Sequence, residues 1–247
     1  MNSHIQIPKC VFREFALSDN GFYKYSVKSN KITRGFPKTT FTEEDYYSKT
    51  MEMILSSRVE SPLSKLLTFA KELPIKSLPI ALDGEIEDIA LTYAKSLVAR
   101  NPLLCQSAIS HSIFGQFLPK RDQHDYCVSY AMSNKKMSEL FSKFDLSFIV
   151  NQTSVPFILA TRGICEFVIN KTICMMSPLN PYCGIFFIEK GKTIHNQIGR
   201  DKEILFIPSD LDGFVTKINS FALTSQSRDG VGYVVCHVRS ILEKLIA

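Results

Sequence analysis

Alternating aromatic and polar residues near the start of the chain predict a β-hairpin over residues 20–41. The alternation covers residues 22–27, and Ser29-Asn30 supplies turn residues before Lys31-Ile32-Thr33 leads back. Pro37 ends the run, because proline has no N–H to donate to a ladder. We therefore expect the first element to be a short, lysine-rich hairpin.

Apolar residues at helical spacing predict a bundle of helices in the middle of the chain. A first helix is expected after a capping box at Thr42–Asp45, and a second over Leu63–Leu73. A third is expected from an N-cap at Asp83 to Asn101-Pro102, and a fourth from there toward Phe117. The fifth covers about Asp122–Phe144. Ser61-Pro62 is typical of an N-cap and first helical position, so a helix is expected to begin there.

Beyond Leu146 the apolar runs become short, β-prone and bounded by turn residues. Strands are predicted at Leu146–Val150, Pro156–Leu159, Cys165–Ile169, Thr172–Met176, Gly184–Ile188 and Val231–His237, with helices at Asp210–Thr224 and Val238–Ile246. Because helices precede strands, the expected class is α+β, with an N-terminal β-hairpin, a central helical bundle and a C-terminal mixed sheet with closing helices. With no repeat or linker, residues 1–247 are predicted to form a single domain.

Composition excludes several classes of protein. Apolar residues make up 45% of the 247 and charged residues 21%, which excludes a disordered or collagen-like chain. A net charge of +5 permits an anionic partner without requiring one. No apolar run approaches the ~18 residues that span a bilayer, and the first residues lack a signal-peptide layout. Seven scattered cysteines fit reduced thiols, so a cytoplasmic location without a membrane partner is expected.

Common catalytic and cofactor motifs are missing from the sequence. There is no phosphate-binding G-x-x-x-x-G-K-[ST], no G-x-G-x-x-G, no G-x-S-x-G and no H-E-x-x-H. There is also no C-x-x-C pair, and His124 with Cys127 supplies only half of a zinc site. No metal ligands are therefore predicted, and the cofactor is left open.

The segment from His4 to Phe15 is dense in apolar residues and predicts a docked N-terminus. A docked segment would partly bury His4. Partial burial can shift the pKa of a histidine to a value suited to general acid–base catalysis. The alternative is a surface histidine beside a packed tail. Arg13 adds a cation to the same segment.

Glu52, Glu60 and Arg100 are the other charged candidates. On an ideal helix Glu52 and Glu60 lie ~80° apart in rotation and ~12 Å along the axis, too far for a carboxylate pair unless the chain bends at Ser61-Pro62. Arg100 ends an apolar helix and is expected to be buried against Glu52 or Glu60. Such a pair is either structural or catalytic.

The predicted hairpin is basic. Its cations are Lys24, Lys28, Lys31, Arg34 and Lys38, with no acidic residue from Gly21 to Thr40. Cations interleaved with aromatic residues suit phosphates and stacked bases, so this segment is a candidate nucleic-acid-binding surface. The alternative is an edge strand whose lysines discourage pairing with other chains.

Taken in order, several motifs resemble a bacterial family known as domain of unknown function 4238. They are His4-x-x-x-Pro8 with Arg13-Glu14-Phe15, Tyr46-Tyr47, Glu52-Met53-Ile54-Leu55 with Glu60, Ala99-Arg100-Asn101-Pro102, Asn151-Gln152-Thr153, Pro156-Phe157-Ile158, Ser177-Pro178-Leu179-Asn180-Pro181 and Asn219. The resemblance spans nearly the whole chain. Thr161 departs from it, because the family typically has an aspartate in a Ser-Asp-Asn-Pro turn at this place.

The resemblance implies a gene context of mobile and antiviral-defence regions in bacteria. The leading hypothesis is a cytoplasmic defence effector that acts on nucleic acid, with RNA favoured and an RNase-like toxin as the candidate activity. His4 would be the general acid or base, Arg100 and Arg13 would stabilise phosphate charge, and Glu52 or Glu60 would be the second acid–base or orienting group. The alternatives are a non-enzymatic sensor that binds a phage component or nucleotide, and a toxin acting on a protein or small molecule. Whether the chain is an enzyme stays open.

Overall fold

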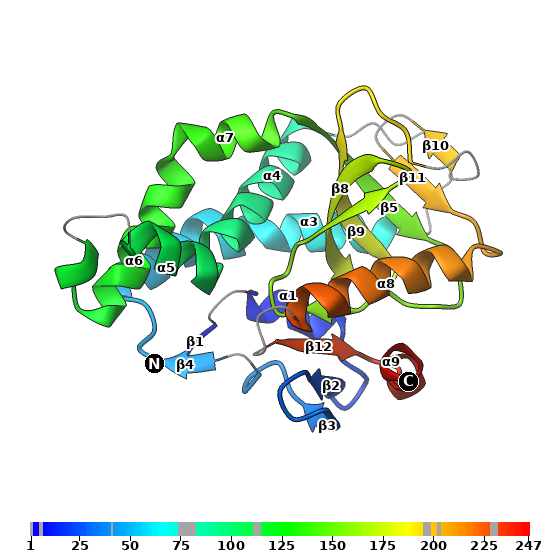
Figure 1. The fold of residues 1–247 in the computed structure, drawn as a ribbon, viewed down its shortest axis with the longest axis horizontal. Helices are drawn as coiled ribbons and strands as arrows, with labels where there is room; N and C mark the ends of the chain where they lie inside the picture. Colours follow the sequence, from blue (N-terminus) through cyan, green and yellow to red (C-terminus); the bar gives the residue numbers. More distant parts are fainter. Residues whose placement is uncertain are drawn as a thin grey trace.

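The computed structural model describes residues 2–4, 7–40, 42–73, 83–110, 115–194, 199–201, 204–227 and 232–247 (Figure 1). Within these ranges, side chains are not described for 2–4, 102–104, 108, 115, 199–201 and 226–227. Among the described helices, none combines the length and apolar character that crossing a bilayer requires.

Nine α-helices and two short helical turns are found in the described residues. The helices are α1 (Lys9–Glu14), α2 (Lys49–Leu55), α3 (Ser61–Glu72), α4 (Gly84–Ala99), α5 (Pro102–Ser110), α6 (Lys120–Ser133), α7 (Lys135–Phe141), α8 (Asp212–Ser227) and α9 (Arg239–Ile246), with a π-helical turn η1 (Ser56–Glu60) and a 3-10 turn η2 (Gly115–Phe117). With the strands, they give the α+β class that the sequence predicts.

The strands form three sheets in the described part of the chain. They are β1 (Asn2–His4), β2 (Phe22–Ser26), β3 (Lys31–Gly35), β4 (Thr42–Glu44), β5 (Phe144–Asn151), β6 (Leu159–Ala160), β7 (Cys165–Ile169), β8 (Thr172–Asn180), β9 (Cys183–Glu189), β10 (Gly199–Asp201), β11 (Ile204–Ile207) and β12 (Tyr233–Cys236). The largest sheet has the order β10-β11-β5-β9-β8-β7 and is mixed, because β11 runs parallel to β5.

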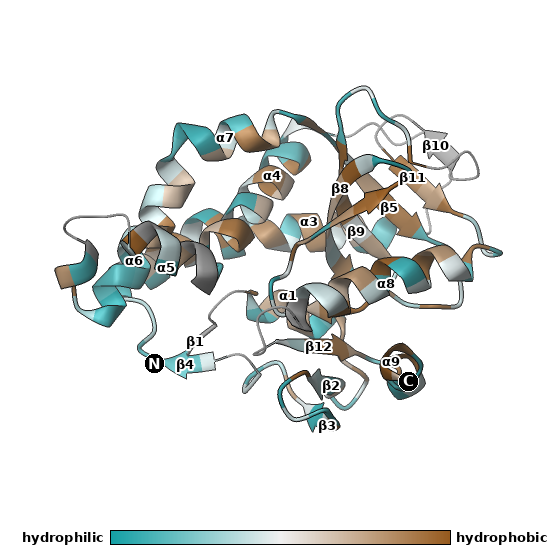
Figure 2. Cartoon of the chain, viewed as in Figure 1, coloured by the Kyte–Doolittle hydropathy of each residue, from teal (hydrophilic) through white to brown (hydrophobic). Residues whose placement is uncertain are grey.

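The six-stranded sheet separates two apolar cores. Successive residues of β5 alternate between them: Phe148 and Val150 face the first core, and Ile149 faces the second. The first core lies between the sheet and helices α1 to α4, and the second between the sheet, α8 and β12. Figure 2 shows the brown, apolar strands in the middle of this arrangement.

The N-terminal hairpin belongs to a larger sheet than the sequence predicts. Strands β2 and β3 pair as expected, but the chain's last strand, β12, inserts between β2 and β6. The order of this sheet is β3-β2-β12-β6, with antiparallel pairing throughout. Residues near both ends of the chain therefore build one sheet (Figure 1).

The predicted helix start at Ser61-Pro62 coincides with the first residue of α3, but Ser61 is not an N-cap that separates this helix from the one before it. The helix runs from α2 through η1 into α3 without a break, because the N–H of Ser61 bonds to the carbonyl of Ser56 across a π-helical turn. Pro62 has no N–H to continue an α-helical ladder, and the wider π turn just before it absorbs this defect. Glu60 ends the π turn.

Two other predicted boundaries are wrong. Residues 42–44 form β4, paired with β1, instead of a capping box, and the helix is capped by Ser48, whose hydroxyl accepts from the N–H of Met51 at 3.1 Å. The predicted helix over Asp122–Phe144 is two helices, because Asn134 leaves the helical conformation and caps α7. Strand β11 was not predicted.

Gly163 allows the turn after β6 to pack closely against α4. Its φ of +69° is left-handed, and a Cβ atom there would lie 2.7 Å from Cδ2 of Leu97 and 3.2 Å from Cγ1 of Ile7. Both residues belong to the first core. A side chain at this position would therefore be unfavourable for two reasons: its left-handed backbone conformation and its steric overlap with Leu97.

Candidate functional site

Arg100 is fully buried at the end of α4. Its backbone N–H bonds to the carbonyl of Ser96 at 3.0 Å and ends the helix. The side chain is 0% exposed, and Nη2 lies 3.6 Å from Oε1 of Glu60, whose side chain is 36% exposed. The structure thus contains the expected ion pair, and the π-helical turn before Pro62 supplies its carboxylate.

Two buried phenols lie close to this ion pair. Burial raises the pKa of Tyr47 and of Tyr93 above the usual range, and the positive charge of Arg100 opposes the shift in both. The hydroxyl of Ser177 in β8 interacts with Tyr93 and also lowers that pKa. Both phenols are therefore protonated hydrogen-bond donors at neutral pH.

A thiol from α1 completes the group. Burial raises the pKa of Cys10 to about 11, with the carboxylate of Glu60 as the next cause. The same thiol acts electrostatically on Tyr93. We call these residues the Arg100 cluster; they are Cys10, Tyr47, Glu60, Tyr93, Arg100 and Ser177.

Glu52 lies beside the cluster, next to Tyr47. Its charge is among the causes that raise the pKa of Tyr47. Its Oε1 atom is buried, and no described residue gives it a hydrogen bond. The two glutamates thus approach the cluster from one continuous helix, and Glu60 is the one ion-paired with Arg100.

The two site residues predicted in the N-terminal segment, His4 and Arg13, lie in different surroundings. The segment from Ile7 to Phe15 is docked as expected, with Val11 and Phe12 fully buried. Arg13 is exposed on α1, whereas Cys10 of the same helix acts on Glu60 and Tyr93. The backbone of His4 pairs with Thr42, and its side chain lies outside the described part of the structure.

Cys10, Tyr47, Tyr93 and Ser177 were not among the site residues predicted from the sequence. One signal was present: Tyr93 and Arg100 are seven residues apart, two helical turns, and so share one face of α4. The contributions from α1 and β8 depend on tertiary packing and have no sequence signal.

The asparagines that contribute to the family resemblance have structural partners. Asn219 accepts from the N–H of Ile158 at 3.1 Å and donates to the carbonyl of Pro156 at 2.9 Å. Asn151 donates to the carbonyl of Val155, and Asn180 accepts from the N–H of Tyr182, both at 2.8 Å. These side chains hydrogen-bond to loop backbone, and Asn151 and Asn180 do so at the ends of β5 and β8.

Thr161 also has a structural partner. Its hydroxyl accepts from the N–H of Tyr233 at 2.7 Å and donates to the carbonyl of the same residue at 2.8 Å. This pair of bonds ties the turn after β6 to the start of β12. Thr161 therefore fixes this turn.

The basic residues of the hairpin do not all face one way. Lys24 and Lys31 share a face, because Lys31 lies opposite Ser26 and alternate residues of β2 point to the same side. Arg34 lies opposite Tyr23 on the other face, where it forms an ion pair with Asp19 and stacks on the Tyr23 ring at 4.8 Å. Arg34 is therefore not on the face that Lys24 and Lys31 share.

The remaining cations are available to a ligand. Lys28, Lys31 and Lys38 are exposed, and the ammonium of Lys24 lies 5.0 Å from the ring centroid of Tyr233. Strand β3 is an edge of its sheet in the described residues, as the edge-strand alternative expects. The structure is compatible with both interpretations of this segment.

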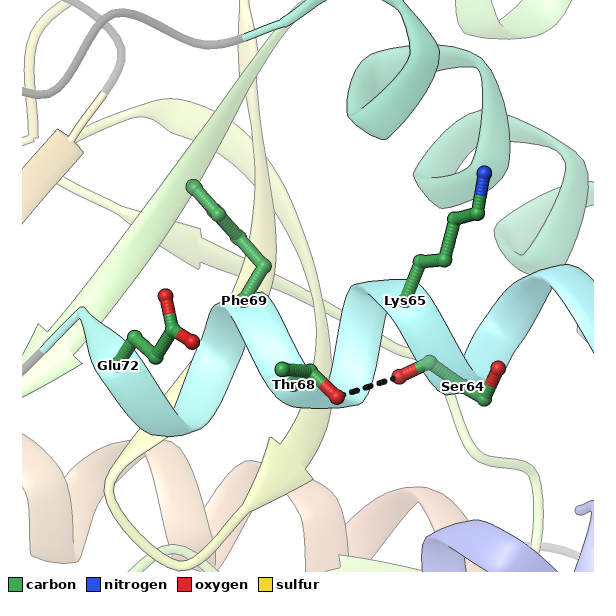
Figure 3. Close-up of a pocket in the computed structure, with 5 residues that line it drawn as sticks. All are labelled: Ser64, Lys65, Thr68, Phe69 and Glu72. Carbon is green, nitrogen blue, oxygen red and sulfur yellow. Dashed lines mark hydrogen bonds between the residues drawn. The ribbon is translucent and has the colours of Figure 1, made fainter.

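A pocket on α3 lies apart from all of these residues. Its volume is about 350 Å³, and it is lined by Ser64, Lys65, Thr68, Phe69 and Glu72 of that one helix (Figure 3). The hydroxyl of Thr68 donates to the carbonyl of Ser64, and Lys65 pairs with Glu85 at 2.5 Å. We assign this pocket no function.

The described residues contain no cluster of the side chains that most often bind metal ions. No group of three or more His, Cys, Asp or Glu side chains is placed to bind one ion there. Comparison of the chain with protein-family models, curated proteins and solved structures finds no match.

Proposed function

We propose that this chain is a bacterial antiviral-defence effector that cleaves RNA at the Arg100 cluster. The single observation that supports cleavage most directly is the pairing of a fully buried guanidinium with a carboxylate that is 36% exposed. A ligand can reach Glu60, while the ion pair with Arg100 holds the carboxylate in position. The bacterial and defence parts of the proposal depend on the resemblance to domain of unknown function 4238.

Cleavage of RNA by its own 2′-hydroxyl requires two proton transfers. One group takes the proton of the attacking hydroxyl, and another gives a proton to the departing 5′-oxygen. We assign the first transfer to Glu60, with Arg100 as its positioning residue, and the second to His4. Exposed Arg13 is assigned to a phosphate contact.

Glu60→Gln tests this assignment. We expect the cleavage rate to fall by about 10²–10⁴-fold, because the amide cannot accept the proton. The measurement is single-turnover cleavage of a labelled RNA, with identification of the 2′,3′-cyclic phosphate and 5′-hydroxyl ends. His4→Ala should cause a loss of the same order, and sequencing of RNA ends from bacteria expressing each protein locates the cuts.

Glu85→Gln is the matched control, because Glu85 is a helical carboxylate in an exposed ion pair with Lys65. It should cleave at the wild-type rate. A folded Glu60→Gln protein that also cleaves at that rate would contradict the role of Glu60, and no cleavage by the wild type would contradict the proposed function.

A second candidate function is binding of a polyanion without catalysis. The observation that favours it is the common face of Lys24 and Lys31, with Lys24 over the Tyr233 ring. Together with Lys28 in the turn, these side chains could contact successive phosphates beside an aromatic ring.

The salt dependence of RNA binding tests the hairpin. Three phosphate contacts predict a slope of about −2 for log affinity against log salt, at roughly −0.7 per contact on single strands. Lys24→Gln/Lys28→Gln/Lys31→Gln should remove most of this slope, whereas Lys65→Gln on α3 should leave it unchanged.

Light scattering on the same samples separates the two interpretations of the hairpin. Under the edge-strand interpretation, RNA binding is unaffected by the triple substitution and self-association increases. Absence of RNA binding by the wild type at ~50 mM salt, where screening is weak, would exclude the binding function.

A further inference from the structure

A second pocket, enclosed by helices α4 to α7, is lined by an unusual set of side chains. Its volume is about 290 Å³, and its wall is largely apolar, with Val98, Ala131 and Leu140 among the lining residues. Three sulfur-containing residues are also among the lining residues: Cys105, Cys127 and Met137. They come from three different helices, α5, α6 and α7.

The two thiols are neighbours. The Sγ atom of Cys127 donates to the carbonyl of Cys105 at 3.4 Å, and each thiol acts on the pKa of the other. The Sγ atom of Cys105 donates to the carbonyl of Ala99 at 3.6 Å. Both cysteines are almost completely buried, so the pocket is their route to a ligand.

The pocket offers soft donors and few hard ones. Among the described residues, its lining includes no carboxylate and no histidine, and its side-chain oxygens are those of Tyr130 and Asn134. It therefore lacks the charged oxygen ligands of magnesium and calcium sites and the histidines typical of catalytic zinc. Thiolate and thioether ligands favour Cu(I), which accepts low coordination numbers and an apolar environment.

We propose that Cys105, Cys127 and Met137 form a binding site for a soft monovalent cation of the Cu(I) class. Binding forms two metal–thiolate bonds and releases one proton from each thiol, with no change of oxidation state. The site then has one net negative charge, which the ammonium of Lys136 at the same pocket can balance. The inference is independent of the proposed RNA cleavage.

Proton release gives the site a distinctive pH dependence. An ordinary thiol has a pKa of about 8.5, so both cysteines carry a proton near pH 7 until a metal replaces it. Metal then competes with two protons. The apparent affinity should therefore rise about 100-fold for each pH unit between pH 6 and 8.

The experiment is an anaerobic titration of the full chain with Cu(I) buffered by a competing chelator. The wild type should bind one equivalent with the 100-fold pH dependence. Cys105→Ala should lose most of the affinity and retain only a tenfold dependence for each pH unit, because one thiol remains. Met137→Leu should bind roughly ten- to hundredfold more weakly, with the two-proton dependence unchanged.

Cys174→Ala is the matched control, because Cys174 is an equally buried thiol in β8. It should bind like the wild type. Equal affinity of the wild type and a folded Cys105→Ala/Cys127→Ala protein would overturn the proposal, as would a wild type with no pH dependence. If the cysteine variants fail to fold, Met137→Leu and the wild-type pH series still decide.

Discussion

Arg100→Ala is expected to lower the free energy of unfolding by about 3–5 kcal/mol. The side chain is among the largest fully buried ones, and its loss leaves a cavity between α4 and the π-helical turn. The substitution also removes the cation paired with Glu60. Urea unfolding followed by circular dichroism measures the change.

Arg58→Ala is the control for this prediction, because Arg58 is exposed on the same π-helical turn. It should stay within about 0.5 kcal/mol of the wild type. Arg100→Lys should retain part of the stability, since lysine keeps the charge without the planar guanidinium. An Arg100→Ala protein as stable as the wild type would show that the buried pair contributes nothing to folding.

Gly163→Ala is expected to cost about 2–5 kcal/mol, from two additive causes. A left-handed φ of +69° costs an L-residue about 1–2 kcal/mol. The new Cβ would lie 2.7 Å from Cδ2 of Leu97, a buried core atom, and overpacking of this kind costs about 1–3 kcal/mol. A thermal melt or urea titration measures the sum.

Gly191→Ala separates the two causes. Gly191 has a similar φ of +73°, but a Cβ added there would have no heavy atom within 4 Å in the described part of the chain. It should therefore show only the backbone cost of about 1–2 kcal/mol. Equal losses for the two substitutions would mean that Leu97 moves aside at no cost.

The sequence predicted the secondary structure correctly where the residues of a single segment determine it. Strand β7 has the predicted bounds, Cys165–Ile169, because its side chains alternate between buried and exposed. The N-cap at Asp83 is also confirmed, since its carboxylate accepts from the N–H of Glu85 at 3.1 Å. Ser61-Pro62 marked the start of α3 but not its continuity with α2, because proline can also follow a π-helical turn inside a longer helix.

The site was predictable only in part, because some of its residues are brought together by tertiary packing and not by local sequence. A buried arginine must meet a negative charge, so the sequence predicted a pair with Glu52 or Glu60, and the structure selects Glu60. Cys10 and Ser177 reach the cluster from α1 and β8, which meet only after the chain folds. Arg34 was placed on a basic face because Asp19, its partner, lies just before the predicted hairpin.

The insertion of β12 between β2 and β6 sets a time at which the second sheet can form during translation. Residues 22–26 leave the ribosome long before residues 233–236. At roughly 5–20 residues per second, the hairpin waits on the order of ten to forty seconds for its partner strand. During this interval one edge of β2 has unpaired backbone groups, so the nascent chain depends on its lysines, or on a chaperone, to avoid premature association.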